Sequence, residues 1–358
     1  MTRTTWRCAC AAALLGTLPQ LATAAPDYFS WTGAGSKYAR ALALNNQGHY
    51  AVNSFGPETP YQGAGIIRQR FAESVGGLGG YITQVRALND LDQAVGLSTT
   101  ATGEDHAFLY AEGHMQDLTA RYGIQDARDI NKRGEIAARS PDFRAAVLRD
   151  GVVDIVGPEY SGPGDINERG EVLVSYDVYD NGFGSRTAVY SQGMLTELPR
   201  VGGSPVSGQA INDAGWVTGY FTQADGRNHA FLWDGDTYFN LTPRARNGFA
   251  YDINNLGQVV GVADGRAFLY ADGRLIDLNT RIDRDADLLL IAADEINDRG
   301  QILAHRCDRT GVFCYGSVLL DPVPAVPEPS TLAMLLAGLG LAAALPPGRA
   351  LRRRRTAA

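Results

Sequence analysis

One short pattern of apolar and polar positions recurs seven times along the chain. It consists of an apolar residue, an asparagine, two variable residues, a turn residue and a second apolar run. In DINNLGQVVG, which begins at residue 252, the asparagine is Asn254 and the turn residue is Gly257. An asparagine side chain can hydrogen-bond the backbone two residues further on, and glycine adopts a positive φ without a steric penalty. Each copy therefore predicts a tight turn between two strands.

The spacing of the repeated asparagine predicts the architecture. Six steps between the seven copies cover 252 residues, an average of 42, which is the period of a β-propeller blade. A helical solenoid would need long segments with apolar residues three and four apart, and the sequence has none. The seven repeat positions are Asn45, Asn89, Asn131, Asn167, Asn212, Asn254 and Asn297.

A second motif alternates with the first and has the pattern of a β-hairpin. AFLYADGRLIDL, which begins at residue 267, contains a β-prone run, a glycine-bearing turn and another β-prone run. One hairpin and one asparagine motif together give four short strands, and we expect the asparagine turn between the third and fourth strands of this unit. We also expect Ile253, Val259 and Val260 to be buried against neighbouring blades, because one four-stranded sheet cannot cover both of its own faces.

The two ends of the repeat array complement each other. The first asparagine motif has only a shortened lead-in, residues 28–31, whereas the last hairpin-type strand, residues 316–320, has no asparagine motif after it. An open array would leave two exposed edge strands. The sequence therefore predicts an all-β fold over residues 25–321: a β-propeller of seven four-stranded blades, closed by pairing of the N- and C-terminal strands.

The N-terminus has the three parts of a secretory signal peptide. Arg3 and Arg7 precede an apolar run over residues 9–18, and small residues follow up to Ala24. The alternative is a buried N-terminal helix, but the apolar run is short and ends in a cleavage-type sequence. We expect residues 1–24 to be removed by cleavage between Ala24 and Ala25.

The C-terminus has a different three-part signal, which follows a linker over residues 322–326. Pro327, Glu328 and Pro329 precede an apolar stretch over residues 331–345 and a cluster of arginines over residues 352–355. This order resembles the PEP-CTERM sorting signal of Gram-negative bacteria. The resemblance implies that an exosortase, a membrane protease, cleaves near Pro327-Glu328-Pro329. The apolar stretch is barely long enough to span a bilayer, so residues 327–358 predict a transient inner-membrane intermediate before release to the cell surface or the medium.

The net charge changes when both terminal signals are removed. The whole chain has a formal charge of −7, and loss of the seven arginines and one glutamate in the two signals brings it to −13. An acidic surface argues against a nucleic-acid partner and against docking to anionic lipid. We therefore expect membrane contact only through the C-terminal segment.

Two cysteines, Cys307 and Cys314, remain after the signal peptide is removed. Asp308 to Gly311 is a plausible turn, so the two cysteines can face each other across a hairpin, and an exported protein meets an oxidising compartment. We expect a disulfide. A free or metal-binding pair is the alternative, but no second cysteine pair or nearby histidine cluster supports zinc.

The two motifs together resemble the HAF repeat of secreted bacterial proteins over residues 64–320. The resemblance rests on triplets such as His106-Ala107-Phe108 and His229-Ala230-Phe231. Only two of the seven units keep the histidine, which argues against a shared catalytic or metal role for it. The resemblance implies an extracellular propeller with no established activity.

A search of the sequence for catalytic and metal-binding patterns predicts no catalytic residue, cofactor or metal site. Asp283, Asp285, Asp287 and Asp294 fall at calcium-loop positions, but Leu288 replaces the glycine that such a loop requires. An acidic residue also stands two places before the repeated asparagine in four units, at Asp129, Asp165, Asp252 and Glu295. Alanine replaces it at positions 43, 87 and 210, so we interpret these residues as part of the turn chemistry.

The sequence leaves two classes of function open. The first is a binding or structural module at the cell surface; the family resemblance would associate it with exopolysaccharide and the biofilm matrix. The second is an extracellular glycan hydrolase or lyase, whose carboxylates different blades would bring together at the central channel.

Overall fold

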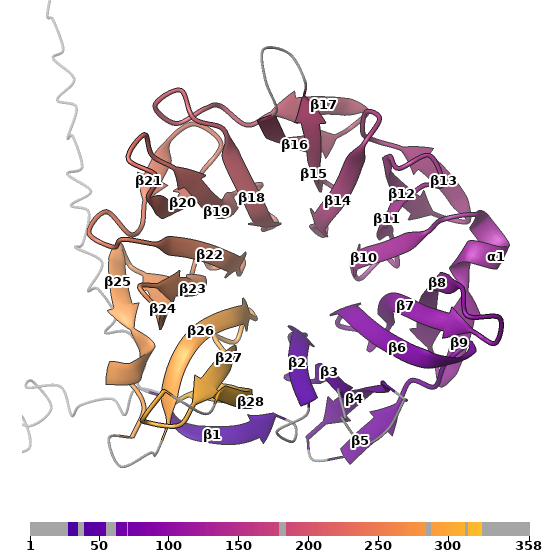
Figure 1. Ribbon diagram of the computed structural model, residues 1–358, viewed down its shortest axis with the longest axis horizontal. Coiled ribbons are helices and arrows are strands. Elements are labelled where there is room, and N and C mark those ends of the chain that lie inside the picture. Colours follow the sequence, from indigo (N-terminus) through magenta and orange to yellow (C-terminus); the bar gives the residue numbers. More distant parts are fainter. Residues whose placement is uncertain are drawn as a thin grey trace, which may run out of the picture. The chain divides into compact units, whose positions relative to one another are not determined.

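The computed structural model describes residues 28–34, 39–54, 62–69, 71–178, 184–283, 288–311 and 314–323. The chain divides into two units, Met1–Pro322 and Val323–Ala358. Five residues of the two predicted terminal signals lie outside the described residues: Ala24, Ala25, Pro327, Glu328 and Pro329. The first unit is a ring of seven four-stranded antiparallel sheets (Figure 1). The predicted seven-bladed β-propeller is confirmed.

Each blade is a simple antiparallel meander running outward from the centre. The innermost strands are β2 (Ala39–Leu44), β6 (Gly79–Leu88), β10 (Asp126–Ile130), β14 (Ser161–Ile166), β18 (Val206–Ile211), β22 (Gly248–Ile253) and β26 (Leu289–Ile296). The second strands are β3 (Tyr50–Ser54), β7 (Ala94–Thr100), β11 (Ile136–Arg139), β15 (Val172–Val178), β19 (Val217–Thr222), β23 (Val259–Ala263) and β27 (Ile302–Cys307). The third strands are β4 (Ala64–Arg68), β8 (Asp105–Ala111), β12 (Ala145–Arg149), β16 (Gly184–Ser191), β20 (Asn228–Trp233), β24 (Arg266–Ala271) and β28 (Cys314–Pro322).

The outermost strands include the one that closes the ring. Six blades end in strands that follow directly in the chain: β5 (Phe71–Ser74), β9 (His114–Asp117), β13 (Val152–Ile155), β17 (Met194–Glu197), β21 (Tyr238–Asn240) and β25 (Arg274–Asp277). The seventh blade takes its outermost strand, β1 (Tyr28–Ala34), from the other end of the chain, and β1 pairs antiparallel with β28. The predicted closure by N- and C-terminal strands is confirmed.

The order of strands within the repeat unit differs from the prediction. The asparagine turn joins the first and second strands of each blade, next to the centre, and the glycine hairpin joins the third and fourth. The expectation of an asparagine turn between the third and fourth strands was wrong. A tandem repeat has no inherent starting point, so the sequence allowed either order; the structure places the asparagines at the centre of the ring.

The core consists of seven apolar clusters, one between each pair of adjacent blades. Neighbouring residues of one strand face opposite sides of their sheet. Val259 accordingly packs with Ile253 against the fifth blade, while Val260 packs against Leu290 of the seventh. All three predicted core residues, Ile253, Val259 and Val260, are at most 6% exposed. Each blade therefore depends on both of its neighbours for burial of its apolar residues.

Two short helical segments interrupt the sheets. Helix α1 (Leu118–Tyr122) begins after Asp117, whose side chain accepts a hydrogen bond from the backbone of Ala120, and a 3-10 turn spans Leu278–Thr280. In the described part of the chain, no helix has the length and apolar composition needed to cross a bilayer. The predicted apolar segment over residues 331–345 lies outside that part.

Cys307 and Cys314 occupy directly opposed positions on β27 and β28, and the structure joins them in a disulfide. We predict that this bond is present in protein exported by its host, because it links two adjacent strands in an oxidising compartment. Mass spectrometry of peptides prepared without a reductant checks this prediction. Recovery of both cysteines as free thiols would contradict it.

Candidate functional site

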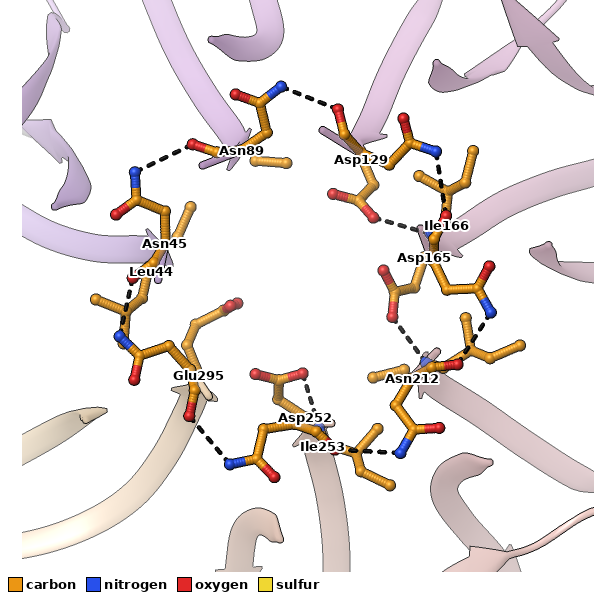
Figure 2. A pocket seen from close by; sticks show the side chains of 18 of the residues that line it. Leu44, Asn45, Asn89, Asp129, Asp165, Ile166, Asn212, Asp252, Ile253 and Glu295 are labelled. Atoms are coloured by element: carbon orange, nitrogen blue, oxygen red, sulfur yellow. Dashed lines mark hydrogen bonds between the residues drawn. The ribbon is translucent and has the colours of Figure 1, made fainter. Parts of the chain in front are cut away.

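Polar side chains from all seven blades line the central channel of the ring. A cavity of about 400 Å³ lies at the end of the channel formed by the asparagine turns. Every blade contributes lining residues from the end of its innermost strand and from the turn that follows. Figure 2 shows these side chains around the opening. We take this end of the channel as the candidate functional site.

The repeated asparagines link all seven blades in one closed cycle of hydrogen bonds. Within a blade, the Oδ1 atom of Asn254 accepts from the backbone N–H groups of Leu256 and Gln258, at 3.1 and 3.0 Å. Its Nδ2 atom donates to the backbone carbonyl of Asn297 in the next blade, at 3.0 Å. The same donation occurs from each blade to the next, and Asn297 completes the cycle by donating to Asn45. The turn asparagine thus also fixes the blades to one another.

The residue after each asparagine forms a second set of links between blades. The backbone N–H of Asp298 donates to the side chain of Asn46 at 2.7 Å, and five other junctions have an equivalent bond. Lysine cannot accept such a bond, and at the junction that ends in Lys132 its ammonium group instead pairs with Asp90 at 2.8 Å. A recurring acceptor side chain directly after the asparagine was the sequence signal for this set, and the sequence analysis missed it.

A β-bulge lies just before the asparagine in each innermost strand and redirects side chains toward the channel. In β22 the register shifts between Ala250 and Asp252, and both Tyr251 and Asp252 line the cavity. The register shifts at the corresponding place in the other six innermost strands. Bulges are a common means of redirecting side chains next to binding sites. Here they bring the residue two places before the asparagine into the channel.

Four carboxyl groups therefore lie together at this level, and we name Asp129, Asp165, Asp252 and Glu295 the acidic collar. One oxygen of each aspartate accepts a backbone N–H from the next blade: Ile166 for Asp129, Ile211 for Asp165 and Ile296 for Asp252, at 2.7–2.8 Å. Figure 2 shows the bond between Asp129 and Ile166. The turn interpretation was incomplete: Asp129 and Asp252 each also accept the backbone N–H of the next residue, but all three aspartates reach across blade junctions along the channel.

Glu295 differs from the three aspartates. Its side chain is one methylene longer, and Figure 2 shows its carboxylate extending into the channel. The residue is partly exposed and lies on the wall of the cavity. Among the described residues, no group donates a hydrogen bond to it. A carboxylate in this position loses hydration without a compensating partner.

Burial and mutual repulsion raise the pKa values of three collar residues. For Asp165, burial is the main cause, followed by the charge of Asp129 and a hydrogen bond to its carboxyl group. Burial also raises the pKa of Asp252 to about 6 and places that of Glu295 well above its usual range; the neighbouring carboxylates add to both shifts. The surrounding protein therefore stabilises the ionised form of these three carboxyl groups less than water does.

The positive groups near the collar have another partner. Arg86 and Arg128 line the cavity, but both pair with the buried Asp126, at 3.0 and 3.1 Å. Arg139 approaches the same carboxylate at 3.7 Å. The remaining charged groups that line the cavity are carboxylates: Asp90, Glu168, Asp213 and Asp298. The excess of negative charge thus extends from the collar to the turns.

Asp252 gives a testable pH dependence. Its pKa is about 6 in the fold and near 3.8 in a free chain, so its contribution favours the native state below pH 4 and is lost as the pH rises through 6. We predict that Asp252→Asn stabilises the protein by about 1–2 kcal/mol at pH 7.5 and by much less at pH 4. Thermal melts of both proteins across this range measure the difference.

The control is Asp225→Asn. The Asp225 carboxylate is half exposed and lies in the turn between β19 and β20. Its effect on melting should not vary with pH over the same range. A stability difference for Asp252→Asn that is equally large at pH 4 would contradict the assigned pKa.

Other residues that the sequence analysis considered lie outside this cavity. His106 pairs with Asp117 at 2.7 Å on the outer strands β8 and β9, and His229 is buried with its Nδ1 atom 2.8 Å from the carbonyl of Thr242. Asp285 and Asp287 of the calcium-loop pattern lie outside the described residues. Among the described residues, no three His, Cys, Asp or Glu side chains are arranged to hold a metal ion.

Fold and site together define the class: a closed seven-bladed β-propeller with an acidic collar in its central channel. The C-terminal segment indicates where the chain is sorted. Residues 325–355 match the PEP-CTERM protein-sorting motif. This motif implies export, sorting to the cell surface or the medium, and processing by an exosortase. No curated protein matches the chain in sequence.

Several solved structures have a similar fold. The propeller domain of the trilobed protease from Pyrococcus furiosus, which has an open velcro topology, gives a TM-score of 0.54 at 9% identity, over 82% of this chain and 100% of that one. YCF48 bound to D1 peptide gives 0.51 at 12% identity, over 84% and 99%. An inactive virginiamycin B lyase from Staphylococcus aureus with quinupristin gives 0.50 at 11% identity, over 82% and 99%. At these identities the similarity concerns the fold alone.

Proposed function

We propose that this protein is an exported binding module that recognises extracellular polysaccharide at the asparagine-turn end of its channel. The observation that carries the proposal is the convergence of polar side chains from all seven blades on one cavity of about 400 Å³. Ligand sites in proteins are typically concave and contain a few convergent polar groups. Surface sorting by the C-terminal motif would deliver this cavity to the extracellular matrix.

A glycan array and a reducing-sugar assay on the same glycans test the proposal. We expect binding without release of reducing ends, and weaker binding when the collar residue Asp165 is changed to Asn. A protein that binds no glycan on the array would contradict the proposal.

A glycan hydrolase or lyase is the second candidate, and one observation favours it. Four carboxyl groups line one cavity, and burial together with the charge of Asp129 raises the pKa of one of them, Asp165. Glycosidases cleave a glycosidic bond with two carboxyl groups on either side of it, one of which has a raised pKa and acts as the general acid. Time-dependent release of reducing or unsaturated ends that Asp165→Asn abolishes would support the enzyme over the binding module.

The sorting tail has a predicted intermediate. We predict that replacing Pro327, Glu328 and Pro329 with alanines in the native host keeps the uncut protein in the membrane fraction, because the exosortase no longer recognises the motif. Fractionation and immunoblotting against the propeller measure this outcome. The wild-type protein should appear in the surface or medium fraction in a shorter form. Retention of the tail by wild-type protein in a host with an active exosortase would contradict the prediction.

A further inference from the structure

The acidic collar has features that a purely structural role does not require. The three aspartates each fasten one blade to the next through one oxygen, and the other oxygen of Asp129 and of Asp252 accepts the backbone N–H of the following residue. Glu295 fastens nothing: no described group donates a hydrogen bond to its carboxylate, which extends into the cavity from a partly exposed residue (Figure 2). A carboxylate without a protein partner on a cavity wall is available to pair with a positively charged group of a ligand.

The chemistry of that partner follows from what surrounds the collar. The arginines that line the cavity are already paired with Asp126, so they neutralise no collar carboxylate. No three carboxyl or histidine side chains among the described residues converge closely enough to coordinate one metal ion. The collar carboxyl groups come from different blades around the cavity, so a positively charged group that pairs with several of them needs several N–H donors of its own. A primary ammonium group has three.

We infer that the acidic collar binds the primary ammonium group of an organic ligand, with Glu295 as its principal charge partner and the aspartates as additional acceptors. This inference rests on the proposed function and specifies the ligand class: a glycan with free amino groups, such as unacetylated glucosamine units. A free polyamine carries the same chemistry. The cavity of about 400 Å³ is open at the turn end, so a longer chain can continue outward from the bound group.

Glu295→Gln is the decisive variant, because it removes the charge without removing a hydrogen bond. The matched control is Glu112→Gln, the same substitution at an exposed position in the hairpin between β8 and β9. Melting curves and circular dichroism establish that both variants are folded. Any difference in binding between them then reports on the position of the charge and not on the net charge.

Isothermal titration calorimetry on the exported protein, with three probes, provides the test: a glucosamine trimer, its N-acetylated counterpart, and spermidine. We expect the glucosamine trimer to bind, its acetylated counterpart to bind at least about tenfold more weakly, and Glu295→Gln to weaken amine binding about tenfold. Glu112→Gln should change affinity by less than about twofold. Equal affinity of the wild type and Glu295→Gln for the amines, or no amine binding at all, overturns the inference.

The probes also separate the inference from the proposed function. Glu295-dependent binding of spermidine without binding of either sugar supports the ammonium site and contradicts polysaccharide recognition. Equal binding of both sugars, independent of Glu295, supports polysaccharide recognition and overturns the ammonium site. Calcium chloride alone producing the same Glu295-dependent heat as the amines would also overturn it.

Discussion

Gly261→Ala is expected to lower the free energy of unfolding by about 3 kcal/mol, because a side chain there has no room beside the bulge of β22. A Cβ atom at this position would overlap the carbonyl oxygen of Phe249 and lie 2.9 Å from the Cα atom of Ala250. Both contacts are backbone, so no side-chain rotation relieves them. Chemical denaturation of the variant and the wild type measures the loss.

Gly162→Ala is the matched control, since no atom lies within 4 Å of the added methyl group and the glycine has an ordinary φ. Its stability should stay within about 1 kcal/mol of the wild type. Other blades have alanine at the position equivalent to Gly261, as at Ala138 and Ala304. An unchanged stability of Gly261→Ala would mean that β22 relaxes toward the geometry of those blades and that the close approach is not required.

Asn254→Ala is expected to cost about 3 kcal/mol, because it removes the two hydrogen bonds that the side chain accepts within the turn, its donation to the side chain of Gln258 and its donation to the next blade. Asn254→Asp separates the two roles: it keeps the acceptor for the turn and loses the donor to Asn297. We expect Asn254→Asp to destabilise as well, since a carboxylate would face the carbonyl of Asn297. Thermal and chemical unfolding provide the comparison.

A turn-only role for Asn254 predicts a different outcome. In that case Asn254→Asp would be as stable as the wild type, because aspartate supports the same turn. Such a result would show that the cycle of seven asparagine donations contributes nothing measurable.

The sequence contained enough information for the architecture and too little for the site. The 42-residue spacing of asparagines and the complementary ends predicted seven blades and their closure. The strand at which each blade begins was not predictable in the same way, because a tandem repeat has the same pattern from any starting strand. Which turn faces the centre depends on how whole blades pack, and that is a property of the ring.

The acidic collar shows most clearly where the local reading failed. Asp129, Asp165 and Asp252 stand two residues before an asparagine, so turn chemistry was the nearest explanation. Besides the local N–H groups of Ile130 and Ile253, their partners are backbone groups 37, 46 and 44 residues away in the chain. The β-bulge that directs them inward leaves no distinct residue pattern in the strand itself. Glu295 looked like an imperfect copy of the aspartates, yet its extra methylene is what leaves it without a partner.

The closure of the ring also determines which strand bears the load when the C-terminal tail is pulled. The chain leaves the propeller at Pro322, the last residue of β28, and β28 is hydrogen-bonded on one side to β27 and on the other to β1. A pull on the tail therefore loads a strand clamped between two others, and cannot peel off an edge strand. β1, the first described strand of the chain, is the outer of the two strands that hold β28. A chain that lost β1 would leave β28 as the edge, and the same pull would then open the seventh blade.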